Sequence, residues 1–96
     1  ELSQFENVAK KAEELIQFYP TQPEFYYYLG LANNQLPNYK KAKDVLETGL
    51  DFVVNDESLE INFYVQLGVA FNGLGDMKKK ETYFSKANDL IKKQKK

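Results

Sequence analysis

The sequence contains no cysteine, no histidine and no arginine. Without cysteine there can be no disulfide, thiolate metal ligand or thiol nucleophile, and the redox compartment stays undetermined. Without histidine the chain lacks the usual general base near neutral pH and the commonest transition-metal ligand. All 13 basic residues are lysines, so the planar fork with which arginine binds carboxylates and phosphates is missing as well. We therefore expect no enzyme, no cofactor and no metal site.

Long hydrophobic runs are also missing. No apolar segment approaches the roughly 20 residues that a membrane span requires, and the first 15 residues show neither the basic start nor the apolar block of an export signal. The acidic group at residues 56–60 lacks the spaced oxygen ligands and the central glycine of a calcium loop. We expect a soluble protein without a membrane span, and the sequence does not indicate its location. Because residue 1 is glutamate, an upstream segment is expected.

The charge is divided unevenly along the 96 residues. Residues 1–76 carry five lysines against twelve acidic residues, a net charge of −7, whereas residues 77–96 carry eight lysines against two acidic residues, a net charge of +6. The division of charge can orient a partner or order copies of the chain head to tail. The length of the chain, 96 residues, fits one domain with a modest core.

A repeat becomes visible when the chain is aligned with itself at an offset of 38 residues. Ten positions between residues 23 and 53 are then identical, among them Phe25/Phe63, Tyr26/Tyr64, Leu29/Leu67 and Gly30/Gly68. An offset of this size is typical of stacked helical repeats. The apolar residues within each copy recur with helical spacing, and Pro37 and Gly75 interrupt the pattern at matching places. The sequence predicts two helical hairpins.

The boundaries of these units follow from local signals. Residues 1–20 form a lone helix, the second half of an incomplete repeat; residues 21–57 form one hairpin, and residues 58–96 form another with a basic tail. Thr21 and Glu24 are predicted to form a capping box at the start of the first hairpin's first helix. Asn38 and Asp76 are predicted to cap the second helix of the first and of the second hairpin, respectively. Asp56 or Ser58 caps the helix after residue 57, and the extra residues before it lengthen the preceding helix by a turn. The mid-helix glycines 30, 49 and 68 predict a second backbone passing nearby.

Together these residues resemble the tetratricopeptide repeat (TPR). Tyr26, Leu29 and Gly30, followed by Ala42 and Leu46, fit the first half and the second half of its pattern, as do residues 64, 67, 68, 71, 84 and 87 in the other copy. The resemblance covers nearly the whole chain. It departs at Asn33, where the pattern has an aromatic residue, at Lys80, where it has alanine, and at Val54, where it has proline. The resemblance implies an all-α, TPR-like solenoid of antiparallel hairpins with about five helices, and we expect it to be the C-terminal part of a longer array.

The resemblance also implies a protein-interaction scaffold. TPR arrays typically bind a peptide or protein segment on the concave face of their first helices. The matching residues here are Glu24, Tyr27, Leu31 and Asn34 in one unit and Asn62, Val65, Val69 and Asn72 in the other. Of the three adjacent tyrosines, Tyr26 is predicted to pack inside its hairpin and Tyr28 between adjacent helices. Tyr27 either faces the partner or merely covers the groove.

Two alternatives stay open. The apolar face of the first helix, made by Phe5, Val8, Ala12, Leu15 and Tyr19, can pair with a second copy and form a homodimer. Nucleic acid or another anionic surface can bind the lysines of residues 78–96, but this is the weaker reading, because the tyrosine-rich half carries the negative charge. The sequence does not identify the partner.

Overall fold

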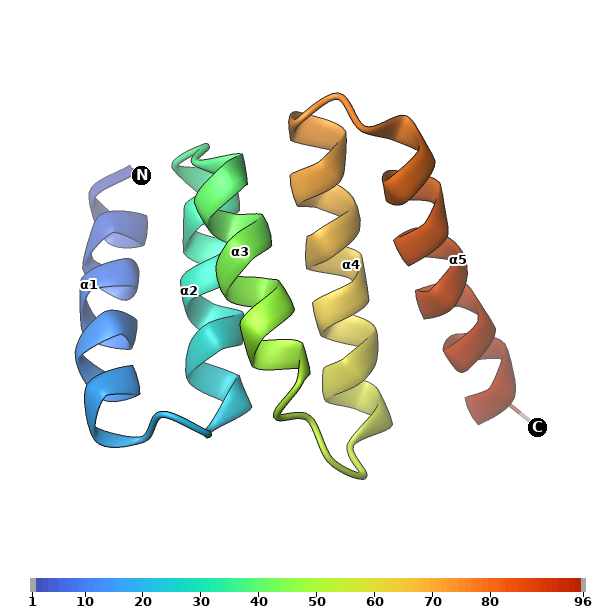
Figure 1. Ribbon diagram of the computed structural model, residues 1–96, viewed down its shortest axis with the longest axis horizontal. Coiled ribbons are helices and arrows are strands. Elements are labelled where there is room, and N and C mark those ends of the chain that lie inside the picture. The colour runs from blue at the N-terminus through green and yellow to red at the C-terminus, as the bar shows by residue number, and fades with distance from the viewer. Residues whose placement is uncertain (1, 96) are drawn as a thin grey trace.

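The computed structural model describes residues 2–95, which form five α-helices and no strand (Figure 1). The helices are α1 (Leu2–Phe18), α2 (Pro23–Gln35), α3 (Tyr39–Leu50), α4 (Glu57–Gly73) and α5 (Met77–Gln94). The predictions of an all-α chain and of five helices are confirmed. Neighbouring helices run in opposite directions, as short connections between packed helices favour (Figure 1).

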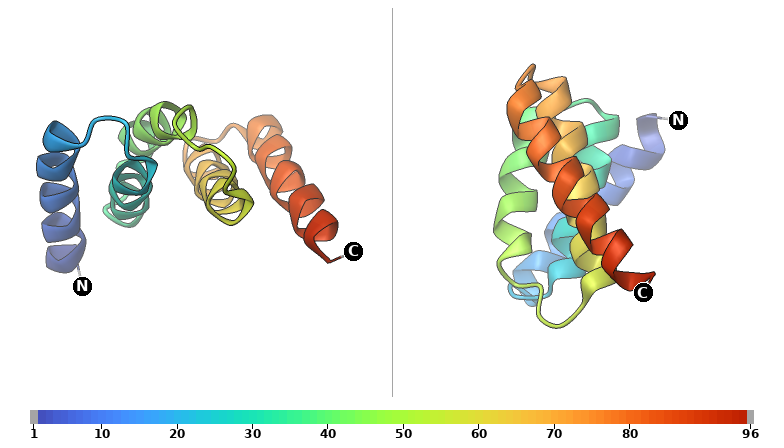
Figure 2. Two further views of the ribbon diagram at one scale, coloured as in Figure 1. Left: turned by 90° about the horizontal axis from the view of Figure 1, so that it is seen from below. Right: turned by 90° about the vertical axis from the view of Figure 1, so that its right-hand side faces the viewer.

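The five helices are arranged in an arc. Each helix packs against the next one in the chain, and α2 also contacts α4. Figure 2 shows α3 on the outer side of the arc, α2 and α4 on its inner side, and α1 and α5 at the two ends. Residues 2–95 therefore have an inner surface built by α2 and α4 and bordered by the two terminal helices.

The core lies where α2, α3 and α4 meet. Phe63, Leu46 and Leu67 are its largest fully buried side chains. Tyr26 keeps 9% of its surface exposed, and its hydroxyl donates a 2.6 Å hydrogen bond to the carbonyl of Pro20. The ring of Tyr26 is therefore buried while its hydroxyl group keeps a hydrogen-bond partner. The prediction that Tyr26 packs inside its own hairpin is confirmed.

The mid-helix glycines let neighbouring helices approach one another closely. A Cβ atom on Gly49 would lie 2.2 Å from the Cβ of Tyr26, and one on Gly30 would lie 2.3 Å from the Cγ of Leu46. These approaches let α2 and α3 pack closely, at the cost in helix propensity that glycine brings. The expected close approach of a second backbone is correct at Gly49, because the Cβ of Tyr26 is bonded directly to the backbone of α2; at Gly30 and Gly68 the nearest atoms belong to the side chains of Leu46 and Phe84.

Two of the predicted helix caps are present. The carboxylate of Asp56 accepts a 3.0 Å hydrogen bond from the amide of Leu59, and that of Asp76 accepts a 3.1 Å bond from the amide of Lys79. Each bond satisfies an amide that the first turn of a helix leaves without a partner.

Two other cap predictions are wrong. Helix α2 begins at Pro23, one residue later than a Thr21 cap needs, so Gln22 occupies the cap position without a side-chain cap bond. Asn38 is in the cap position of α3, but its amide donates instead to the carboxamide of Asn33, at 3.3 Å. Asn33 is buried and itself donates to the carbonyl of Leu29. The polar residue in the expected aromatic position is therefore hydrogen-bonded.

The segment between α3 and α4 also differs from the prediction. Helix α3 ends at Leu50, and residues 51–56 form an irregular connection rather than an extra helical turn. Phe52 and Val53 pack against the core from this connection, and Asn55 has a left-handed backbone conformation with a φ of 52°. The irregular connection thus lets both apolar side chains contact the core.

A candidate binding surface on the inner side of the arc

Four of the predicted partner-binding residues belong to α2, and they differ in how accessible they are. Glu24 is half-buried in the first turn and accepts a 2.7 Å hydrogen bond from the side-chain amide of Gln22. Tyr27 is half-buried, with its ring centroid 5.9 Å from that of Phe63 on α4. Leu31 is half-buried as well. The ring of Tyr27 therefore bridges α2 and α4 and still has exposed surface.

Asn34, the fourth residue on α2, is only 4% exposed. Its amide nitrogen donates to the backbone carbonyl of Gln66 at 3.0 Å and to the side-chain carbonyl of Gln66 at 2.9 Å. The carboxamide oxygen of Asn34 is buried and has no hydrogen-bond partner among residues 2–95. A buried carbonyl without a donor is costly. Asn34 thus links the two inner helices and also has one unused acceptor.

The other four predicted residues belong to α4. Val65 and Val69 are half-buried, whereas Asn62 and Asn72 are exposed near the two ends of the helix. Residues 62, 65, 69 and 72 share one helical stripe, since they are three or four positions apart. Because α2 and α4 contact each other on the inner side of the arc, the two predicted quartets lie on adjacent helices (Figure 2).

The residues predicted for self-association are only partly available. Ala12 is 3% exposed, and Phe5 and Leu15 are half-buried, since α1 packs against α2. Val8 and Tyr19 remain exposed, at 41% and 56%. An ion pair of 2.8 Å between Lys41 and Glu13 adds a contact from α1 to α3. Of the face predicted for self-association, only Val8 and Tyr19 are therefore exposed enough to contact a second copy.

Sequence reasoning missed a hollow between α1 and α2. One pocket of about 410 Å³ is lined by Tyr19, Gln22, Glu24, Phe25 and Tyr28. A second pocket of about 220 Å³ shares Phe25 and Tyr28 with the first and is otherwise lined by Val8, Lys11, Ala12 and Leu15. Tyr28, which we predicted to pack between helices, borders both pockets and is 48% exposed. The aromatic residues Tyr19, Phe25 and Tyr28, close together in the sequence around the turn that precedes α2, could have indicated this hollow.

The lysines of α5 engage aromatic rings of the second hairpin. The ammonium group of Lys79 lies 5.4 Å from the ring centroid of Phe71, and that of Lys86 lies 5.7 Å from Tyr64 and 5.5 Å from Tyr83. The rings of Phe71 and Tyr83 are stacked at 5.6 Å. Cation–π contacts of this kind stabilise the hairpin and occupy two of the lysines considered for nucleic-acid binding.

Electrostatics single out three tyrosines. Burial, followed by the neighbouring Tyr28, raises the pKa of Tyr27. Burial also raises the pKa of Tyr83, with a further contribution from Glu47. The pKa of Tyr64 rises to about 12, first through burial and then through the hydrogen bond to Glu60. All three hydroxyl groups are therefore neutral near pH 7, and none acts as a base there.

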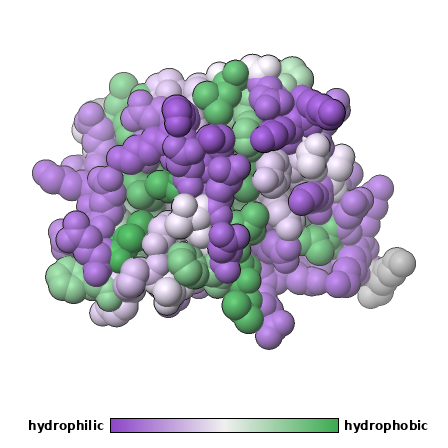
Figure 3. Space-filling model, viewed as in Figure 1, coloured by the Kyte–Doolittle hydropathy of each residue, from purple (hydrophilic) through white to green (hydrophobic). Residues whose placement is uncertain are grey.

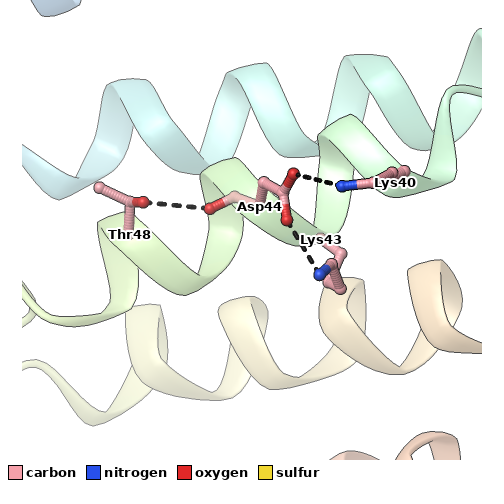
Figure 4. A network of polar contacts seen from close by, with 4 residues as sticks. All are labelled: Lys40, Lys43, Asp44 and Thr48. Atoms are coloured by element: carbon pink, nitrogen blue, oxygen red, sulfur yellow. Dashed lines mark hydrogen bonds and ion pairs between the residues drawn. The ribbon is translucent and has the colours of Figure 1, made fainter.

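The outer side of the arc is polar. Figure 3 views this side and shows mostly hydrophilic side chains with small, scattered apolar patches. On α3 the carboxylate of Asp44 pairs with Lys40 at 3.3 Å and with Lys43 at 2.9 Å (Figure 4). The hydrogen bond from Lys43 is the main reason that the pKa of Asp44 is lowered. These exposed pairs contribute little to stability and mark no site.

Residues 2–95 contain neither a membrane-spanning helix nor a cluster of metal ligands. None of the five helices combines the length and the apolar character that crossing a membrane requires. No group of three or more acidic residues lies close enough to hold a metal ion. Comparison of the chain with protein-family models, with curated proteins and with solved structures finds no significant match.

Proposed function

We propose that the chain is a TPR-like interaction module whose inner surface binds a segment of another protein. The observation that carries this proposal is a strip of half-buried side chains on two adjacent helices, namely Tyr27 and Leu31 on α2 and Val65 and Val69 on α4. Partly exposed apolar side chains in a row gain free energy when a partner covers them. The 38-residue repeat and the antiparallel hairpins support the same reading.

The polar residues of the surface suit a peptide backbone. Asn62 and Asn72 are exposed at opposite ends of the α4 stripe, and each can donate to and accept from a peptide group. The surface contains no lysine among its eight residues, so acidic partner tails are not the expected class.

Site-specific photo-crosslinking tests this proposal. A photoreactive residue in place of Asn72 should give one discrete adduct, because this position is exposed on the inner helix α4. The matched control replaces Ser85, which is exposed on α5 outside the proposed surface. Replacing Val69 with lysine should abolish the adduct at position 72 while the circular dichroism spectrum is unchanged. Equal capture from positions 72 and 85 would show that the inner surface is not the binding surface.

A second candidate function is self-association through α1. It is favoured by three exposed apolar side chains of this helix, Leu2, Val8 and Phe18, and by the exposed Tyr19 directly after it. Sedimentation of the wild type and of a Val8→Lys variant at increasing concentration separates the two functions. A dimer that the substitution dissolves supports self-association, whereas a wild type that stays monomeric throughout excludes it.

A further inference from the structure

The pocket of about 410 Å³ between α1 and α2 combines three aromatic rings with one carboxylate. Its lining consists of Tyr19, Phe25 and Tyr28, together with Glu24 and the amide of Gln22. No lysine pairs with Glu24 among residues 2–95, and no ammonium group of those residues lies over any of the three rings. Aromatic faces and a carboxylate both attract a cation.

The same protein contains an occupied counterpart of this arrangement. In the second hairpin the rings of Tyr64 and Tyr83 are 6.0 Å apart and inclined at 39°, and the ammonium group of Lys86 lies within 6 Å of both. Glu60 stands beside them and accepts a hydrogen bond from Tyr64. This cluster shows what a tilted ring pair of such spacing, with a nearby carboxylate, holds in this chain: an alkylammonium group.

The ring pair at the α1–α2 turn has almost the same geometry. The centroids of Tyr19 and Phe25 are 5.9 Å apart and their planes are inclined at 46°. The carboxylate of Glu24 belongs to the same pocket, and Tyr28 adds a third ring. Residues 1–76 together carry a net charge of −7, which favours the approach of a cationic partner to this part of the chain. The internal cluster and the pocket therefore share ring spacing, ring tilt and a carboxylate.

The turn holds these groups in place before any ligand binds. The amide of Tyr19 donates to the carbonyl of Leu15 at 2.8 Å, and the amide of Gln22 donates to the carbonyl of Tyr19 at 3.2 Å. The hydroxyl of the buried Tyr26 holds the carbonyl of Pro20 between them. These bonds fix the backbone of the turn, so binding orders only the exposed rings of Tyr19 and Tyr28.

We propose that this pocket binds the alkylammonium side chain of a lysine, free or methylated, on a partner protein. The ammonium group lies among the three rings beside Glu24, and the aliphatic stem lies toward the adjoining pocket, which is lined by Val8 and Leu15 and also by Lys11, whose charge is paired with Glu14. A protein is the favoured source of the cation because Glu24 also belongs to the proposed peptide-binding surface. In that respect only, the inference rests on the proposed function.

Nuclear magnetic resonance titration with small probes tests the pocket without any partner. The probes are blocked lysine, blocked trimethyl-lysine and blocked norleucine, which has the aliphatic stem but no charge. Both charged probes should shift the resonances of residues 19–28 in a saturable manner and bind about fivefold or more tightly than norleucine. Norleucine binding equal to that of the charged probes, or no saturable shift with any probe, would overturn the inference.

Two pocket variants and one control variant sharpen the test. Glu24→Gln should weaken the binding of blocked trimethyl-lysine about fivefold, whereas Glu81→Gln, which removes a carboxylate from a surface without rings, should leave it unchanged. Tyr28→Ala should weaken binding as well, and its folding is checked by circular dichroism, since this side chain is 48% exposed. Unchanged affinity in Glu24→Gln would refute the role of the carboxylate.

A last comparison separates this pocket from the proposed inner surface and from a lipid partner. Val69→Lys should leave probe binding intact, so failure of the crosslinking experiment and failure of the pocket are distinguishable. Phosphocholine that binds more tightly than blocked trimethyl-lysine would assign the pocket to a lipid headgroup and overturn the assignment to a protein side chain.

Discussion

Replacing Gly49 with alanine probes the contact that holds α2 against α3. Glycine near the end of α3 costs helix propensity, so alanine should stabilise an unobstructed helix by up to about 1 kcal/mol. In this fold the new Cβ would lie 2.2 Å from the Cβ of Tyr26 and 2.9 Å from a ring carbon of Phe63. Carbon atoms in contact are normally about 3.5 to 4.0 Å apart. The added methyl group therefore cannot be accommodated without movement.

The size of the effect depends on what can move. The Cβ of Tyr26 is fixed to the backbone of α2, so the two helices must separate by about 1 Å. Overpacking of this kind typically costs about 1 to 3 kcal/mol. Gly68 provides the matched comparison, because its nearest neighbours are ring atoms at the outer edge of the half-buried Phe84, which can turn aside. We expect Gly49→Ala to lose about 2 kcal/mol and Gly68→Ala to stay within about 1 kcal/mol of the wild type.

Urea denaturation followed by circular dichroism measures both values. A domain of this length has a total unfolding free energy of about 5 to 14 kcal/mol, so a loss of 2 kcal/mol is easily resolved. The slope of free energy against urea should be the same in all three proteins, because the same surface is exposed on unfolding. A Gly49→Ala protein as stable as the wild type, or less affected than Gly68→Ala, would refute the close approach of α2 and α3.

Three further predictions concern single polar groups. Asp76→Ala should lower the unfolding free energy by about 1 kcal/mol in urea denaturation, because it removes the cap of α5. Asn34→Ala should lower it by about 1 to 2 kcal/mol, since the link to Gln66 is lost. The pKa of Tyr64 is raised from 10.0 to about 12, so its neutral form is favoured in the folded state. Stability from this group is therefore complete below pH 10.0 and is lost as the pH rises toward about 12.

Each of these predictions has a control. Thr21→Ala should leave stability unchanged, because this residue caps no helix, and an equal loss in Thr21→Ala and Asp76→Ala would contradict the cap assignment. Asn62→Ala, at an exposed position, should be as stable as the wild type. Tyr64→Phe should remove part of the loss of stability above pH 10, as measured by urea denaturation at several pH values. An identical pH dependence with phenylalanine at position 64 would sink the assignment to this hydroxyl.

Periodicity predicted the helices well because it reports which side of a segment is buried. The hairpin positions of Tyr26, Leu46 and Phe63 follow from apolar spacing alone, and all three are in the core. Caps were predictable where an aspartate stands directly before a helix, as Asp56 and Asp76 do. These features depend on residues close together in the sequence.

The features that were missed depend on tertiary contacts. The end of α3 at Leu50 is set by the burial of Phe52 and Val53, which local propensity does not reveal. Asn34 bonds to a residue 32 positions away, so its burial could not be read from its own helix. The hollow between α1 and α2 arises only when the two helices pack, which brings Val8 and Tyr28 to a common rim.

The way in which the helices contact one another has a consequence for local unfolding. Helix α1 packs against α2 alone, apart from one exposed ion pair to α3, and α5 packs against α4 alone, whereas α2 and α4 also touch each other. Detaching a terminal helix therefore breaks one interface, but detaching an inner helix breaks two or more. Amide hydrogen exchange should be slowest in α2, α3 and α4 and faster toward both ends of the row. The α1–α2 turn, with its ring-lined pocket, then lies at a boundary between two units that open at different free energies.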